Sequence, residues 1–224
     1  MEIGAVIAEA WDLYWKHWRH LVPIALIVFL VTAGLTAAAI QSGDVINIVL
    51  ASIISIVGSF WLQGALVRAV EDVRDGKVDM TIGQTFASVR SKLAKIGVAG
   101  ILAGIGIGIG LLLLVVPGLI LMTMWIFVVP VIVLEGRGII ESFSRSAEMT
   151  RGRGWNVFGL IVVTFLISLA FGLLLGIFIA PLDEATRRFV GDLIGGTLIG
   201  PFMTTAWTLA YFHLRGEDRG REVF

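Results

Sequence analysis

Six long apolar runs, separated by charged segments, limit what this chain can fold into more than any other feature. Each run has close to the roughly 20 residues with which a helix crosses about 30 Å of hydrocarbon. Hydrocarbon offers no hydrogen-bond partner to backbone groups, so spanning segments of this length are expected to be helical. The runs lie at about residues 21–41, 45–67, 95–116, 118–135, 155–180 and 189–213. The sequence therefore predicts an all-α membrane protein with six transmembrane helices.

Composition supports this class and narrows the functions. The chain is 57% hydrophobic and 15% charged, with a mean hydropathy of +0.94, well above soluble domains. Its formal net charge is zero, which gives no support for a nucleic-acid partner. It has no cysteine, so disulfides, thiolate nucleophiles and thiolate metal sites are excluded together. We expect a single integral membrane domain over residues 1–224, ending in a short polar cytoplasmic tail at 215–224, without a separate soluble catalytic domain.

Basic residues are distributed unequally between the two sides of the membrane. Of the 17 Lys and Arg, two precede the first run, six lie between the second and third, four between the fourth and fifth, and three follow the last. The other side receives only Arg187 and Arg188. Because cytoplasmic loops carry the excess of Lys and Arg, we expect a multi-pass protein of the cell membrane with both termini cytoplasmic. No charge separates the third run from the fourth, and Pro117-Gly118 predicts a tight hairpin there.

A short amphipathic segment precedes each pair of runs. The first, within residues 1–20, carries an aromatic stripe at helical spacing that includes Trp11 and Trp18. The second starts with Thr81 and Gln84 in a capping-box pattern. We therefore expect three cytoplasmic-side amphipathic helices.

The third of these segments follows Glu135. Its apolar face is expected at Ile140, Phe143 and Ala147. The opposite face is charged, with Glu141 and Arg145 at the favourable i,i+4 spacing.

These segments suggest an internal repeat. The units cover about residues 1–68, 80–136 and 137–214, and each consists of one amphipathic helix followed by one transmembrane hairpin. Arranged around an axis, they predict a pseudo-threefold bundle.

Glycines recur at four-residue spacing within the runs. Small residues at this spacing allow helix backbones to approach closely in lipid. A packing role is favoured over the alternative, that the glycines line a pore or a lipid groove. The helix-packing candidates are Gly100, Gly104, Gly108, Gly172, Gly176, Gly196 and Gly200.

Glu135 is the titratable group of most interest, because a carboxylate at a membrane boundary is costly unless it is hydrated or paired. A functional interpretation makes it a proton or headgroup contact. The structural interpretation, which we favour, pairs it with Arg137, Arg145 or Arg151 and so holds the surface helix against the span.

A cytoplasmic basic belt surrounds this position. Its cations would either hold anionic lipid phosphates or only set the topology, and topology is favoured. The candidate headgroup or interface residues are Arg90, Lys92, Lys95, Glu135, Glu141, Arg145, Arg151 and Arg153. The expected membrane-interface anchors are Trp11, Trp15, Trp18 and Trp155.

Catalytic and metal-binding patterns are missing from the sequence. His17 and His20 are three residues apart, but no third ligand completes a metal site, so interfacial solvation is the better explanation. No acidic pair or Ser-His couple occurs within the runs. We expect neither an enzyme nor a cofactor.

The stretch from Pro130 to Trp155 resembles an uncharacterised integral membrane family that includes the membrane domain of glycerophosphoryl diester phosphodiesterases and the YciC-like proteins. In those phosphodiesterases hydrolysis resides in a soluble barrel that has no counterpart here. The resemblance therefore implies a membrane module of about six spans and not the enzyme. The matching residues are Pro130, Val133-Leu134-Glu135-Gly136, Glu141, Ser142, Phe143, Arg145-Ser146, Met149-Thr150-Arg151-Gly152 and Trp155.

Together these features predict a non-enzymatic membrane scaffold or lipid-interacting module at the cytoplasmic leaflet. The alternative is a transporter or channel for a lipid or small solute, because three hairpins around an axis would enclose a path. The expected partners are membrane lipids, anionic ones in particular. A homo-oligomer or an unidentified membrane protein partner is also compatible with the glycine pattern.

Overall fold

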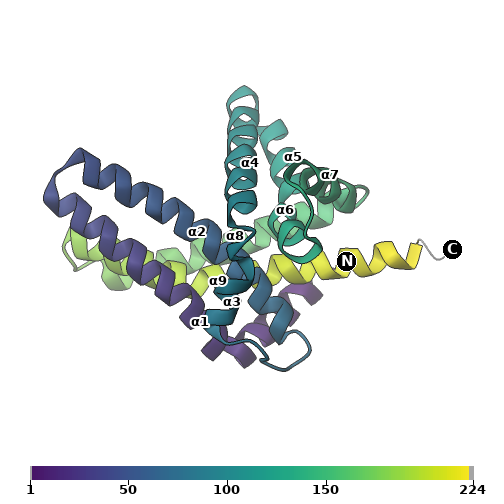
Figure 1. The fold of residues 1–224 in the computed structure, drawn as a ribbon, viewed down its shortest axis with the longest axis horizontal. Helices are drawn as coiled ribbons and strands as arrows, with labels where there is room; N and C mark the ends of the chain where they lie inside the picture. The colour runs from purple at the N-terminus through teal and green to yellow at the C-terminus, as the bar shows by residue number, and fades with distance from the viewer. Residues whose placement is uncertain (1, 222–224) are drawn as a thin grey trace.

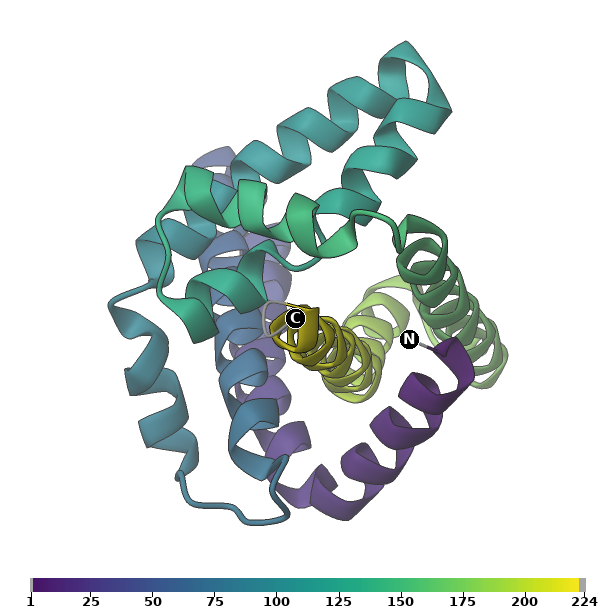
Figure 2. The ribbon, with the colours of Figure 1, turned by 90° about the vertical axis from the view of Figure 1, so that its right-hand side faces the viewer.

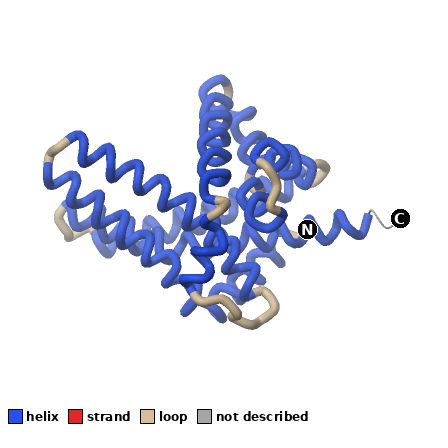
Figure 3. The backbone as a smooth tube through the Cα atoms, in the orientation of Figure 1, coloured by secondary structure: helices blue, strands red, loops and turns tan. Residues whose placement is uncertain are grey.

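The computed structural model describes the backbone of residues 2–221 and the side chains of residues 2–216, and this part of the chain contains helices and no strand (Figure 3). Six segments are long and apolar enough to cross a membrane: α1, α2, α4, α5 through η1, α8 and α9. The prediction of an all-α protein with six membrane spans is confirmed. The elements are α1 (Ile3–Ser42), α2 (Val45–Val73), α3 (Ile82–Arg90), α4 (Leu93–Leu113), α5 (Val115–Trp125), α6 (Val128–Pro130), the π-helix η1 (Val131–Glu135), α7 (Ile139–Thr150), α8 (Gly154–Ile179) and α9 (Glu184–Arg221).

Two of the three hairpins lie side by side, and the third extends in a different direction. The α1–α2 and α8–α9 hairpins run alongside each other, with α1 packed along α9 (Figure 1). The α4–α5 hairpin stands away from them and contacts α2 near its base (Figure 2). At its far end Leu112 is 88% exposed. The expected pseudo-threefold bundle is therefore not found, because only the base of the second hairpin is packed against the other two. The division into repeat units remains a prediction.

α1 joins the expected N-terminal surface helix to the first span in one helix. Only His17 departs from helical geometry, with φ −117° and ψ 19°. On the inner side Val6, Ala10 and Tyr14 are buried, while Trp11 stays half exposed. The buried face of this segment is thus made by small residues and Tyr14, and the exposed tryptophan face, which also includes Trp15 and Trp18, is free to meet lipid headgroups.

The turn between α4 and α5 lies at Leu114, three residues before the expected Pro117-Gly118 hairpin. Leu114 has an extended backbone, with φ −160° and ψ 140°, and α5 begins at the next residue. Pro117 falls in the first turn of α5, where a missing N–H leaves no helical bond unmade. A Cβ on Gly118 would lie 2.4 Å from the Leu111 side chain, so this glycine is needed for the close approach of the two helices.

Glycine packing is seen at some of the predicted positions. A Cβ on Gly100 would lie 2.1 Å from the Phe60 ring, and one on Gly196 would lie 2.4 Å from the ring of Phe29, which also borders Gly200. The other four candidates have no atom within 4 Å of that position, so the packing role predicted for them is not found within this chain: Gly104, Gly108, Gly172 and Gly176. The reason is the side of each helix that faces its neighbour. On α4 the glycines that face α5 are Gly106 and Gly110, on another side of the helix from Gly104 and Gly108.

Seen along its axis, α9 lies at the centre of the molecule with the other helices around it (Figure 2). Its Leu209 and Tyr211 side chains are fully buried, and Phe127 packs against Tyr211 with ring centroids 6.3 Å apart. α9 continues to Arg221, so the first part of the predicted polar tail is helical, whereas residues 222–224 lie outside the described residues.

Candidate functional site

Four segments of the chain are rich in charged residues, at about residues 2–20, 68–95, 133–154 and 211–221. The structure brings these four charge-rich segments to one end of the molecule, although they are far apart in the sequence (Figure 1). The turns after α1 and after α8 lie at the opposite end (Figure 1). Four contacts join the segments: His213 Nε2 lies 3.5 Å from Glu9 Oε2, the Arg74 guanidinium lies 4.1 Å from the centre of the Phe212 ring, Lys92 Nζ donates to the Val133 carbonyl, and Tyr211 Oη lies 2.9 Å from Glu135 Oε1.

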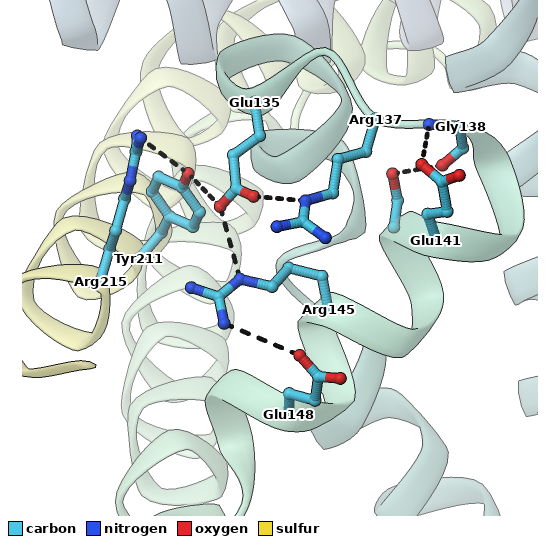
Figure 4. Close-up of polar contacts among 9 residues, drawn as sticks. Glu135, Arg137, Gly138, Glu141, Arg145, Glu148, Tyr211 and Arg215 are labelled. Carbon is cyan, nitrogen blue, oxygen red and sulfur yellow. Dashed lines mark hydrogen bonds and ion pairs between the residues drawn. The ribbon is translucent and has the colours of Figure 1, made fainter. Parts of the chain in front are cut away.

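Glu135 is the centre of this end of the molecule. Its side chain is 9% exposed, and Arg137 Nε donates to Oε2 at 2.7 Å. Tyr211 Oη donates to Oε1 at 2.9 Å, and Arg145 Nε lies 3.7 Å from the same oxygen (Figure 4). Arg215 in turn donates to Tyr211 Oη at 3.3 Å. Glu135, Arg137, Arg145, Tyr211 and Arg215, from η1, the loop after it, α7 and α9, are called the charged junction.

The charged junction gives the Glu135 carboxylate the partners that a nearly buried charge requires. Both oxygens are engaged, and the partners come from the loop after η1, from α7 and from α9. The favoured structural interpretation of Glu135 is therefore what the geometry shows: the carboxylate ties the end of the fourth span to the surface helix α7 and to α9. Arg137 and Arg145 are the arginines that approach it.

The loop between η1 and α7 is set by glycines and by Glu141. Gly136 has a φ of 71°, a left-handed conformation that favours glycine, and it ends η1. Gly138 N donates to Glu141 Oε2 at 3.1 Å, so Glu141 caps the first turn of α7. Arg145, the expected i,i+4 partner of Glu141, extends instead to Glu135 and to Glu148, at 3.7 Å from each. Glu141 thus has a structural role at the start of the helix.

α7 buries only part of the predicted face: Phe143 is partly buried and packs against Trp125, with ring centroids 5.0 Å apart. Ile140 is 71% exposed, whereas Ser142, Ser146 and Met149 are buried. Ser146 Oγ donates to the Met124 carbonyl at 2.6 Å and accepts from Phe127 N at 3.2 Å. These two backbone groups lie where the fourth span is interrupted between α5 and α6, so the serine satisfies polar groups that the break leaves free. Apolar periodicity alone does not detect a hydroxyl face of this kind.

The predicted basic belt divides into partly buried and exposed cations. Lys92 points inward to the Val133 carbonyl, and burial lowers the pKa of its ammonium group. Arg90 and Lys95, on either side of it, are exposed, as is Arg151. Arg153 is partly buried at the start of α8. The exposed members are the ones free to meet a ligand in the membrane surface.

A groove of about 1090 Å³ opens beside the charged junction, between α5, α7 and the start of α8. Along α5 it is lined by Val116, Leu119 and Ile120. Its polar end is the loop between α7 and α8, with Arg151 and Arg153. Trp155, an expected interface anchor, lines the same end and is 86% exposed. The cations of this end were predicted, but the groove was not, because it depends on how three helices meet.

Sequence comparison places most of the chain in a family without assigned biochemistry. No curated protein and no solved structure gives a significant match to the chain. A family model described as a domain of unknown function, DUF7847, matches residues 61–214, which is more than half of the chain and includes the groove and every residue of the charged junction except Arg215. The protein therefore belongs to the DUF7847 family.

Proposed function

We propose that this protein is a non-enzymatic membrane module that binds anionic lipids at the cytoplasmic leaflet. The observation that carries the proposal is the convergence of the four charge-rich segments at one end of an otherwise apolar molecule. Fifteen of the 17 Lys and Arg belong to these segments, and the remaining two, Arg187 and Arg188, belong to the opposite loop. By the positive-inside rule, the convergent end faces the cytoplasm.

The exposed cations of that end are suited to lipid phosphates. Arg90, Lys95 and Arg151 are exposed, and each Lys or Arg near an anionic membrane surface contributes about 1 kcal/mol to its attraction. The half-exposed Trp11 and the more exposed Trp155 would lie at headgroup level on the same side. A cationic surface flanked by interfacial tryptophans favours anionic over zwitterionic lipids.

Two features support a binding role over catalysis or transport. The Glu135 carboxylate already has Arg137, Tyr211 and Arg145 as neighbours, so it is not placed as a free base. The centre of the molecule at this end is filled by side chains such as Phe127 and Tyr211, both fully buried. A packed centre is expected of a scaffold, whereas a transport path needs a polar cavity that reaches the midplane.

The test compares two pairs of cations that differ in the end of the molecule they occupy. Arg90→Gln with Lys95→Gln removes two exposed charges at the convergent end, and Arg187→Gln with Arg188→Gln removes two at the other. Each variant is reconstituted in an equimolar mixture of phosphatidylglycerol and phosphatidylcholine, and native mass spectrometry measures the lipids that it retains after extraction in mild detergent.

We expect the wild type and the Arg187/Arg188 variant to retain phosphatidylglycerol preferentially, and the Arg90/Lys95 variant to lose most of that preference. Equal retention of the two lipids by the wild type would contradict the proposal. So would a loss of preference in the Arg187/Arg188 variant alone.

A further inference from the structure

We propose that the groove between α5, α7 and α8 is a binding site for one anionic phospholipid. The phosphate lies at Arg151, and an acyl chain lies along α5. This inference rests on the proposed function and adds to it a defined site and a ligand class, a glycerophospholipid with a negative headgroup. Its support is the combination of an apolar wall, a cationic end and an opening toward the membrane in one cavity.

The apolar wall continues from the groove into the hydrocarbon. Val116 and Ile120 line the groove from α5 and are also 64% and 53% exposed. On the other side the groove is bordered by Phe158 of α8. An acyl chain can therefore enter sideways from the bilayer and pack against α5 without leaving hydrocarbon.

The cationic end is suited to a phosphate. Arg151 is exposed and lines the groove, and its guanidinium makes no hydrogen bond or ion pair among the described residues. Gly152, with φ 77°, turns the chain directly after it. The groove end also contains Glu148, whose carboxylate lies 3.7 Å from Arg145 and is thereby partly compensated. A guanidinium that is not engaged elsewhere can bind a phosphate with two parallel hydrogen bonds.

The size and position of the groove favour a lipid over a soluble ligand. Its volume of about 1090 Å³ lies just above the roughly 300–1,000 Å³ of small-molecule sites. A soluble phosphate or a free headgroup would contact only the loop between α7 and α8, and would leave the α5 wall unfilled. A phospholipid of the surrounding leaflet supplies both parts, and the exposed Trp155 lies where its glycerol region would be.

The experiment fills the groove without removing a charge. Ser144 lines the groove and is exposed on α7, so Ser144→Trp places a large ring in the cavity. The matched control is Ile140→Trp, one turn earlier on the same helix, at a position that is 71% exposed and does not line the groove. A third variant, Arg151→Gln, removes the charge at the polar end.

Dioleoyl phosphatidylglycerol and dioleoyl phosphatidylcholine are titrated separately into delipidated protein, glycerol 3-phosphate is added as a competitor of phosphatidylglycerol, and binding is followed by native mass spectrometry. We expect one phosphatidylglycerol to bind first, with an affinity about tenfold lower in Ser144→Trp and unchanged in Ile140→Trp. Arg151→Gln should weaken phosphatidylglycerol about fivefold, which corresponds to the loss of about 1 kcal/mol, and should leave phosphatidylcholine unaffected. Glycerol 3-phosphate should not compete, because it has no chain.

A photoactivatable group at the end of one acyl chain shows whether the bound lipid lies in the groove. Crosslinks to residues 116–120 of α5, away from the polar end, are expected, and they should disappear in Ser144→Trp. Phosphatidylglycerol bound equally by Ser144→Trp and Ile140→Trp would overturn the groove assignment, and so would crosslinks confined to other helices. Competition by glycerol 3-phosphate would indicate that the cationic end of the groove binds a soluble phosphate instead of a lipid. If the Arg90/Lys95 variant still loses its anionic preference in those cases, the proposed function stands while the groove assignment fails.

Discussion

Tyr211 and Glu135, 76 residues apart, are joined by a hydrogen bond of 2.9 Å from the phenol to the carboxylate. Tyr211 is fully buried in α9, and Glu135 is the last residue of η1. Through this bond and the two arginines beside Glu135, the end of the fourth span, the surface helix α7 and the last span are held together. The charged junction thus stabilises the end of the molecule where we expect lipid to bind.

Substitutions of Tyr211 and of Glu135 should separate the contribution of the hydroxyl from that of the carboxylate. Tyr211→Phe removes only the hydroxyl and should cost about 1 kcal/mol, the typical value for one hydrogen bond. Glu135→Ala leaves Arg137 and Arg145 without their carboxylate and should cost about 3 kcal/mol, because uncompensated charges remain. Unfolding in mixed micelles of increasing SDS content measures both. In the double variant the two losses of stability should not add, because Glu135→Ala has already removed the acceptor of the Tyr211 hydroxyl. Fully additive losses would contradict the coupling between Tyr211 and Glu135.

Ser146 should contribute more to the stability of the protein than the small size of its side chain suggests. Ser146→Ala removes the partner of the Met124 carbonyl and of Phe127 N, and leaves two backbone groups unsatisfied at the break in the fourth span. We expect a loss of about 2 kcal/mol in the same unfolding assay. Ser144→Ala, on the exposed side of the same helix, is the control and should have little effect. Equal stabilities of the two variants would show that the break is stabilised in another way.

Two glycines of α4 should respond differently to the same substitution. At Gly100 a Cβ would lie 2.1 Å from the Phe60 ring, so Gly100→Ala should force the base of the α4–α5 hairpin away from α2 and cost about 1–3 kcal/mol. At Gly104 nothing lies within 4 Å, so Gly104→Ala should be neutral, or stabilising by up to about 1 kcal/mol through helix propensity. A destabilising Gly104→Ala would indicate that this face packs against another chain.

Some of this structure could be predicted from the sequence because it depends on local patterns. Run length gave the six spans, and the Thr81–Gln84 capping box is present as expected, with Gln84 N donating to Thr81 Oγ1 at 3.3 Å. The charge of Glu135 at the end of an apolar run was sufficient to predict pairing with neighbouring arginines, since a lone carboxylate there is costly.

The rest depends on how distant segments meet, which local patterns do not contain. The same four-residue spacing joins Gly104 to Gly108 and Gly106 to Gly110, and it does not say which of the two pairs faces α5. Pro117 is suited both to a turn and to a first helical turn, and tertiary packing decides between them. The hydroxyl of Ser146 stabilises a break in a span 22 residues away in the sequence, and no periodicity points to it.

The measurement that tests the account most directly is the side of the membrane on which the charged junction lies. The chain has no cysteine, so single cysteines introduced at Asp44, Ser91 and Arg137 can each be labelled without background. In intact cells, a maleimide that cannot cross the membrane should label the variant Asp44→Cys. It should label Ser91→Cys and Arg137→Cys only after the cells are permeabilised. Labelling of Arg137→Cys in intact cells would place the charged junction outside and contradict a role at the cytoplasmic leaflet.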